Sequence, residues 1–398
     1  MTDTFQAQVS RVKVSERLLR ALQNERCIDL RYRQLNPTLA SDPTLPNYKV
    51  MKQAALRRRL GWLYRPAIAV ARVSMPFYSM LQWCIALLFS LGRSRASTAN
   101  GHVIATAPNN VALIQAALRT DCELAEINFD TDLLQIRTLA ASLGTIGVLR
   151  SIASYCHLLL NILFGRRDER GDLLLHSRDA FQLAMLCHYI DTHPHHWFAT
   201  ECHYQRWAFL LSHSAPRWAL VQHGFLDTEI DFPNECGPVT ILFGRSDIFY
   251  GQFRRLYRID RFAKFAPVIS LQPNKFAERA LFLASSFPSI AEEIAVLRGI
   301  KERVDVPVIV KFHPSHVYDE RKSELAALAE LICNSTDYPD CKVFISNNSF
   351  MEYDYQSAGK KTFAISSFGD VGAAIDAVTS WLAEDSSTRG ERHSGTSA

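Results

Sequence analysis

The sequence predicts an α/β protein with two Rossmann-like domains and an N-terminal helical extension. Three observations lead to this prediction. The chain has 398 residues, too many for one hydrophobic core of ordinary size. From residue 102, short apolar runs alternate with segments of helical periodicity, which is typical of βαβ units around a parallel sheet. After residue 239 the alternation starts again, which indicates a second domain of the same kind.

The composition narrows the class of protein. Hydrophobic residues make up 48% and charged residues 21%, as in folded soluble proteins. A net charge of +4, spread along the chain, is too weak for a nucleic-acid surface, so we expect no nucleic-acid partner. The nine cysteines form no C-x-x-C pair, which favours free thiols in a reducing compartment. The first residues lack the apolar core of a signal peptide, so we expect a cytoplasmic protein.

Changes in composition and in hydrophobic periodicity along the sequence set the expected domain boundaries. We expect a helical, basic extension at 1–100, a first domain at 101–238, a second at 239–383 and a disordered tail at 384–398, where small, polar and charged residues prevail. The expected strands of the first domain are His102–Ala107, Glu123–Phe129, Asp172–His176, Trp197–Thr200 and Trp218–Gln222. Those of the second are Val239–Gly244, Ala280–Ser285, Val306–Phe312, Lys342–Ser346 and Lys361–Ser366, with helices at Ile290–Arg303, Glu320–Cys333 and Met351–Ala358.

Two uncharged apolar segments favour contact with a membrane. Val73–Gly92 is long enough to span a bilayer, but Pro76 and several polar residues dilute it. Basic residues stand on both sides of it, whereas a spanning helix shows its positive bias on one side. The basic residues are Arg57, Arg58, Arg59, Arg65, Arg93 and Arg95. Ile152–Phe164, followed by Arg166 and Arg167, repeats the pattern. We expect peripheral attachment to the inner membrane surface; two buried core helices are the alternative.

Polar residues that follow the strands are the candidates for a site, because ligands of parallel sheets bind beyond the carboxyl ends of the strands. In the first half, Trp218–Gln222 runs into His223 and Gly224. A histidine there suits a general base, because its ordinary pKa lies near neutrality. Gln222, Gly224 and Glu201, which follows Trp197–Thr200, are expected to contact substrate. The alternative is a histidine that merely caps a strand.

In the second half, Val306–Phe312 contains Lys311 and runs into His313, and both suit a phosphate. Ser285 and Ser286 follow another strand and are expected to line the same edge.

Asn348 and Ser349 precede the helix that contains Asp354. Their side chains suit phosphate binding, or simply cap the helix. Asp354 is expected to accept hydrogen bonds from ribose. Since the sequence has no glycine-rich phosphate loop, these residues would have to hold a nucleotide.

In this order, the motifs resemble bacterial GT-B glycosyltransferases of capsule, lipopolysaccharide and teichoic-acid synthesis. These include CDP-glycerol glycerophosphotransferases and GT-B polysialyl- and Kdo-transferases. The resemblance spans about residues 102–380. The residues that carry it are Gln222, His223, Gly224, Lys311, His313, Pro314, Ser349, Asp354, Gly359 and Lys360.

The resemblance implies a nucleotide-sugar donor, CMP- or CDP-linked, and a glycan or lipid-linked acceptor, with no metal and no other cofactor. It implies that the first domain binds the acceptor and the second the donor. His223 would deprotonate the acceptor hydroxyl, and His313 would bind the donor phosphates across the cleft. The sialyltransferase-like members use an acidic pair followed by glycine, and this sequence lacks it, because Asp227 and Glu229 come after Gly224.

Two metal motifs and two other functions are the alternatives. Asp130 and Asp132 mimic the D-x-D metal site of GT-A glycosyltransferases. His193, His195 and His196 cluster without a Cys or carboxylate at ligand spacing, so we expect a solvated loop and no metal. The same fold also serves nucleotide-sugar 2-epimerases, and a catalytically degenerate scaffold in a polysaccharide assembly complex is the non-enzymatic alternative.

Overall fold

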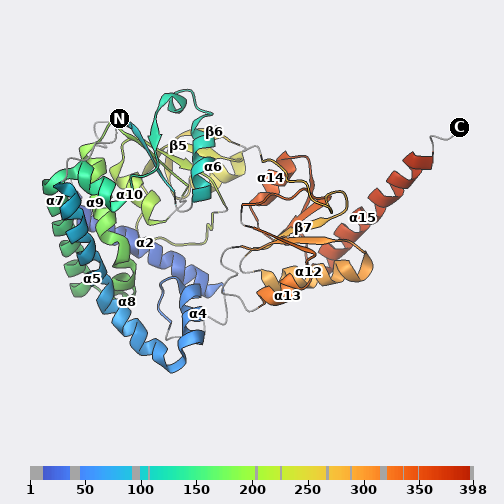
Figure 1. Ribbon diagram of the computed structural model, residues 1–398, viewed down its shortest axis with the longest axis horizontal. Coiled ribbons are helices and arrows are strands. Elements are labelled where there is room, and N and C mark those ends of the chain that lie inside the picture. The colour runs from blue at the N-terminus through green and yellow to red at the C-terminus, as the bar shows by residue number, and fades with distance from the viewer. Residues whose placement is uncertain are drawn as a thin grey trace. The chain divides into compact units, whose positions relative to one another are not determined.

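The computed structural model confirms an α/β protein with two sheets, both entirely parallel (Figure 1). The chain divides into unit 1, residues 1–265, and unit 2, residues 266–398, and each is described by itself. The structure describes residues 12–35, 45–91, 99–105, 108–201, 205–224, 226–265, 269–286, 289–313, 321–334, 336–347 and 349–394.

Unit 1 contains a six-stranded sheet in the order β2-β1-β3-β4-β5-β6. The strands are β1 (Gly101–Ile104), β2 (Phe129–Asp130), β3 (Trp197–Thr200), β4 (Trp218–Val221), β5 (Pro238–Gly244) and β6 (Arg258–Lys264). β1, β3 and β4 are buried throughout, as expected for parallel strands covered on both faces. The chain moves outward from β1 in one direction to β2 and in the other to β3. The topological switch point of this sheet therefore lies between β1 and β3.

Most helices of unit 1 pack into one core with the sheet. The helices of unit 1 are α2 (Val14–Gln34), α4 (Val50–Leu60), α5 (Tyr64–Ser90), α6 (Pro108–Leu118), α7 (Ile136–Phe164), α8 (Arg167–His176), α9 (Ala180–Thr192), α10 (Arg206–Ser214) and α11 (Asp247–Phe253), of which α4 and α6 pack in separate apolar clusters. α9 is the central helix: its residues from Ala180 to Ile190 are nearly all buried in the largest core cluster. Gly144 interrupts α7 with a φ of 63°, a conformation that glycine adopts without strain.

The structure corrects several expected elements of unit 1. Val239–Gly244 was placed in the second domain, but β5 pairs with β4 and β6 and belongs to the first sheet. Asp172–His176 is the end of α8 rather than a strand, and two acidic residues in the first turn favour that helix. β6 was not anticipated, because its sequence RIDRFAK is charged and partly exposed, as suits an edge strand.

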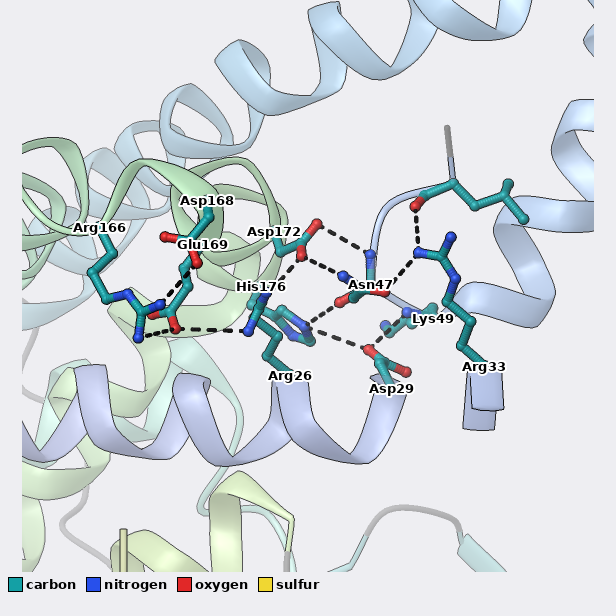
Figure 2. Close-up of polar contacts among 11 residues, drawn as sticks. Arg26, Asp29, Arg33, Asn47, Lys49, Arg166, Asp168, Glu169, Asp172 and His176 are labelled. Carbon is teal, nitrogen blue, oxygen red and sulfur yellow. Dashed lines mark hydrogen bonds and ion pairs between the residues drawn. The ribbon is translucent and has the colours of Figure 1, made fainter. Parts of the chain in front are cut away.

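A network of polar side chains fastens α2 to α8 and to the segment before α4 (Figure 2). Asp172 accepts hydrogen bonds from Arg26 Nε at 3.1 Å and from Asn47 Nδ2 at 2.9 Å. His176 Nε2 lies 3.1 Å from the Asn47 carbonyl oxygen and 3.4 Å from Asp29 Oδ2. Burial lowers the pKa of His176 to about 4 and raises that of Asp29 to about 7. The extension expected at 1–100 is thus partly built into unit 1 by buried polar contacts.

Unit 2 contains a five-stranded sheet in the order β11-β10-β7-β8-β9. The strands are β7 (Leu281–Ala284), β8 (Val308–Lys311), β9 (Leu331–Cys333), β10 (Val343–Ser346) and β11 (Lys361–Ala364). The helices are α12 (Ile290–Arg303), α13 (Lys322–Ala326), α14 (Met351–Ser357) and α15 (Val371–Ser394). The chain leaves β7 toward β8 and later returns to β10 on the other side. The switch point of this sheet therefore lies between β7 and β10.

Two expected elements of unit 2 differ in the structure. Within the range expected as one helix, Glu320–Cys333, the structure has the short α13. The last three residues of that range form the edge strand β9. The tail expected to be disordered from 384 continues α15 as far as Ser394. α15 packs closely on α12, where a Cβ at Gly299 would lie 2.3 Å from Ile375 Cδ1, so that glycine permits the contact.

Candidate functional site at the carboxyl edges of the sheets

In unit 1, the switch point carries a buried carboxylate. Glu201 directly follows β3 and has no exposed surface. Its Oε1 accepts a hydrogen bond of 2.8 Å from Nδ2 of Asn110, in the helix that follows β1. The two elements that flank the switch point are therefore joined at their carboxyl ends. Sequence reasoning missed Asn110; its place near the start of the helix after β1 was the signal that could have found it.

His223 follows β4 at the same edge, and solvent reaches its ring. Its Nδ1 lies 2.7 Å from the Glu201 carbonyl oxygen. A carbonyl oxygen only accepts hydrogen bonds, so Nδ1 carries the proton and Nε2 carries the lone pair. The structure thus brings together two residues that the sequence analysis selected separately, and the contact with the carbonyl fixes the orientation of the His223 ring.

The side chain of Gln222 holds the backbone beside this histidine in place and is not directed at solvent. Its side chain is buried, its Oε1 accepts from the backbone N–H of Arg245 at 3.0 Å, and its Nε2 donates to the Gly224 carbonyl at 3.3 Å. These contacts tie the end of β4 to the end of β5. They leave the amide of Gln222 occupied, so the structure gives it a positioning role in place of the expected contact with substrate.

In unit 2, the residues after β7 surround a buried carboxyl group. Ser285 Oγ donates to Glu293, the backbone N–H of Ser286 donates to Glu293 Oε1 at 2.8 Å, and Ser286 Oγ lies 3.0 Å from the same oxygen. Glu293 lies in the first turn of α12 and has no exposed surface. Burial raises its pKa to about 7. The two serines, expected to bind a nucleotide, bind Glu293 instead.

The same cluster joins the two strands of the switch point. Ser286 Oγ donates to the Asn347 carbonyl oxygen directly after β10, and Asn347 Nδ2 donates to Glu292 Oε2 at 2.5 Å. Sequence reasoning overlooked Glu292, Glu293 and Asn347, because the carboxyl groups sit within an ordinary helical pattern. Two acidic residues in the first turn of α12 were the available signal.

Lys311 and His313 lie at the end of β8, next to β7 in the sheet. Lys311 Nζ donates to the Asp337 carbonyl at 2.8 Å and lies 4.6 Å from the centre of the Tyr338 ring. Burial lowers the pKa of Lys311. His313 is exposed to solvent two residues further on. Pro314, which forms the His-Pro motif with His313 in the sequence, lies outside the described residues.

The remaining predicted residues of unit 2 have structural roles. Ser349 Oγ accepts from the backbone N–H of Met351 at 3.3 Å, which makes a local turn just before α14. Gly359 ends that helix with a φ of 75°, and Lys360 Nζ lies 2.5 Å from Asp340 Oδ1. Asp354 is buried within α14, away from a ribose in solvent. Asn348 lies outside the described residues.

The residues of the two metal motifs contact other groups of unit 1. Asp130 Oδ1 accepts from the backbone N–H of Asp132 at 2.9 Å, which makes a local turn. His193 stacks on Tyr189 with ring centres 4.1 Å apart. His196 Nδ1 lies 3.1 Å from Nε2 of the buried His102, so part of the expected solvated loop is packed. Within the described ranges, no group of three or more His, Cys, Asp and Glu residues is placed to hold a metal ion.

Comparisons of this chain with protein-family models, with curated proteins and with solved structures found no match.

Proposed function

We propose that the protein is a transferase that moves a nucleotide-activated sugar, or a polyol-phosphate unit, onto a glycan or lipid-linked acceptor. One observation carries the proposal: His223 is exposed at the carboxyl edge of the unit 1 sheet, with Nδ1 fixed on the Glu201 carbonyl oxygen at 2.7 Å. Transfer to a hydroxyl requires a base near neutral pH, and an imidazole whose Nδ1 donates to a carbonyl can take up a proton only at Nε2.

The proposed reaction divides its tasks between the units. In unit 1, Nε2 of His223 takes the proton of the acceptor hydroxyl. The acceptor oxygen forms a bond to the anomeric carbon, or to phosphorus when a polyol phosphate is moved. The bond from that atom to the leaving oxygen breaks, and its electron pair stays with the nucleotide phosphate. In unit 2, Lys311 and His313 are proposed to stabilise that charge by donating hydrogen bonds.

A nucleotide screen tests the donor half of the proposal. CMP, CDP, UDP, GDP and TDP are added separately, and thermal unfolding is followed. A nucleotide at about 100 times its Kd stabilises the folded state by about 2.7 kcal/mol and raises the melting temperature accordingly. We expect one nucleobase to be preferred. If none of the five raises the melting temperature, the donor assignment is wrong.

Turnover of the donor that carries the preferred nucleotide separates the enzyme from its alternatives. The transferase releases nucleotide only when acceptor is present, and His223→Ala loses this release while keeping nucleotide affinity. A 2-epimerase would convert the nucleotide-sugar without any acceptor. A degenerate scaffold would bind nucleotide and turn over nothing. Retained transfer in His223→Ala would overturn the assignment of the base.

A further inference from the structure

One face of α5 carries large apolar side chains that the protein leaves in solvent. Val70, Val73, Phe77, Leu81 and Leu88 are 66%, 63%, 62%, 60% and 70% exposed. Their spacings of three, four and seven residues place them on one side of the helix. At a rise of 1.5 Å per residue, this stripe is about 27 Å long. It is therefore a continuous apolar face rather than a scatter of surface residues.

In the second half of α5, the opposite face of the helix consists of small or polar side chains. Ser79, Gln82 and Ala86 are its buried residues in the second half of the helix, and Ser79 Oγ donates to the Arg178 carbonyl at 3.2 Å. A surface helix of a soluble protein normally buries its large apolar side chains and exposes its polar ones. In α5 this arrangement is reversed, so the needs of the unit 1 core do not account for the outer residues.

α7 packs along α5 (Figure 1) and carries further exposed apolar side chains. Its exposed apolar side chains are Ile146, Leu149, Leu160, Leu163 and Phe164, the last of them 85% exposed. The patch formed by these residues and the α5 stripe, called here the α5–α7 face, comes from two neighbouring helices. Contiguous exposed apolar areas of this kind mark contact with a protein, a ligand or a membrane.

The charges within the two helical segments of the α5–α7 face are all of one sign. Neither residues 50–91 nor residues 136–164 include an Asp or Glu, although the whole chain has 40 of them against 44 Lys and Arg. The exposed basic residues in and beside these segments are Lys52, Arg58, Arg59, Arg65, Arg137, Arg150, Arg166 and Arg167. An exposed acidic residue, Asp168, pairs with Arg166 at 2.9 Å. Trp62, 83% exposed, stands just before α5. Apolar side chains with basic and aromatic residues beside them suit the boundary between lipid tails and anionic headgroups.

We propose that the α5–α7 face inserts into the surface of an anionic lipid bilayer and anchors unit 1 there. Both helices have the length and hydropathy to span a membrane. The inner face of α7, however, belongs to the unit 1 core through Val148, Tyr155, Leu158 and Ile162. A spanning α7 would have to leave that core. The helices instead lie in the interface with only their outer faces immersed, about 5–10 Å deep.

Vesicle flotation tests this proposal with the full-length protein. Vesicles of phosphatidylcholine are compared with vesicles that also contain phosphatidylglycerol. We expect binding to the anionic vesicles, weakened by added salt. Leu81→Glu combined with Leu88→Glu is expected to reduce the partition coefficient at least about tenfold, because charged side chains resist burial in lipid. Val73→Gln with Phe77→Gln is the second variant, expected to act in the same direction.

Matched controls separate lipid contact from general effects. Ile248, in α11, is 72% exposed and lies in the same unit, so Ile248→Glu should bind vesicles like the wild type. Arg59→Gln with Arg65→Gln should lose roughly tenfold or more on anionic vesicles, since each basic residue near such a surface contributes about 1 kcal/mol. Unchanged melting temperatures would show that the variants fold.

Three results would overturn the proposal: no vesicle binding by the wild type, equal loss in Ile248→Glu, or retained binding in both apolar variants. A concentration-dependent dimer that Leu81→Glu with Leu88→Glu dissociates, without vesicle binding, would assign the face to a second copy of the chain. The assay contains no nucleotide or acceptor, so its outcome is independent of the proposed transferase.

Discussion

The carboxyl edges of the two sheets can be compared directly, because both units have a parallel sheet with one switch point and a buried glutamate beside it. In unit 1, Glu201 follows a strand, and its carbonyl oxygen holds the exposed His223. In unit 2, Glu293 belongs to a helix, and Ser285 and Ser286 enclose it. In unit 1 the backbone of the buried glutamate holds an exposed histidine, whereas in unit 2 the buried glutamate binds serines and the exposed His313 follows another strand.

This difference teaches that a switch point fixes where polar groups gather but not what they do. The exposed base in unit 1 suits proton transfer. The closed cluster in unit 2 joins β7, β10 and α12 through Ser286, Asn347 and Glu292. A donor nucleotide in unit 2 would therefore meet a rigid edge, with Lys311 and His313 as its nearest candidate cations. The following predictions test this contrast.

Loss of the imidazole in unit 1 should have the largest effect. His223→Ala is expected to lower the rate of transfer about 10²- to 10⁴-fold, the usual contribution of a general base. The measurement is nucleotide release with acceptor present. His195→Ala removes another exposed histidine of unit 1 and should change nothing. Equal rates for His223→Ala and the wild type would show that His223 is not the base, and the two sheet edges would then not differ in function.

Loss of the enclosed carboxyl in unit 2 should act on stability. Glu293→Leu leaves the Ser285 hydroxyl and the buried backbone N–H of Ser286 without their acceptor, and should cost about 2–4 kcal/mol of unfolding free energy. Urea unfolding measures this. Glu302→Leu, at an exposed position of the same helix, should stay within about 0.5 kcal/mol of the wild type. A similar small change for Glu293→Leu would mean that the cluster does not stabilise unit 2.

Glu293 should also make stability depend on pH. Its pKa is raised from 4.5 to about 7 in the folded state, so between these values the folded state holds a proton that the unfolded state has lost. The contribution is complete below pH 4.5 and falls as the pH rises through about 7, by about 3 kcal/mol in all. Glu293→Gln should remove this slope.

The comparison is made between Glu293→Gln and the wild type at each pH, because Asp29 in unit 1 has a pKa shifted in the same direction. Urea midpoints measured from about pH 5 to about pH 8 provide it. Parallel profiles for the two proteins would show that Glu293 is ionised in the folded state throughout this range.

Lys311→Met should weaken nucleotide binding about tenfold, the effect of losing about 1.4 kcal/mol of charge-assisted hydrogen bonding to phosphate. Isothermal titration with the preferred nucleotide measures it. Lys301→Met is the matched control, because Lys301 also donates to a backbone carbonyl in unit 2, that of Leu328 at 3.1 Å. An equal loss of nucleotide affinity in both variants would indicate a general effect of positive charge and not a specific contact between Lys311 and the phosphate.

The smallest effect is expected at Ser349. Because its hydroxyl accepts one local hydrogen bond before α14, its replacement by alanine should cost about 0.5–1 kcal/mol of stability and leave nucleotide affinity unchanged. A drop in affinity without a drop in stability would restore Ser349 as a nucleotide ligand.

Much of the fold could be predicted from the sequence, because buried parallel strands are uninterrupted apolar runs. Trp197–Thr200 is a strand over the expected residues, and Ile290–Arg303 is a helix over the expected residues. The failures occurred where that signal is absent. The charged strand β6 and the assignment of β5 to the first sheet depend on pairing partners distant in sequence.

Within the candidate site, the sequence by itself determined that His223, Glu201, Lys311 and His313 follow strands, because strand exits can be located from apolar runs. Only the tertiary structure decided that Glu201 and His223 meet, since their contact joins adjacent strands through a backbone carbonyl. It also turned Ser285 and Ser286 toward Glu293, a partner supplied by the following helix. Residue type and spacing specify what a side chain can bind, whereas packing decides which of the possible partners lies within hydrogen-bond distance.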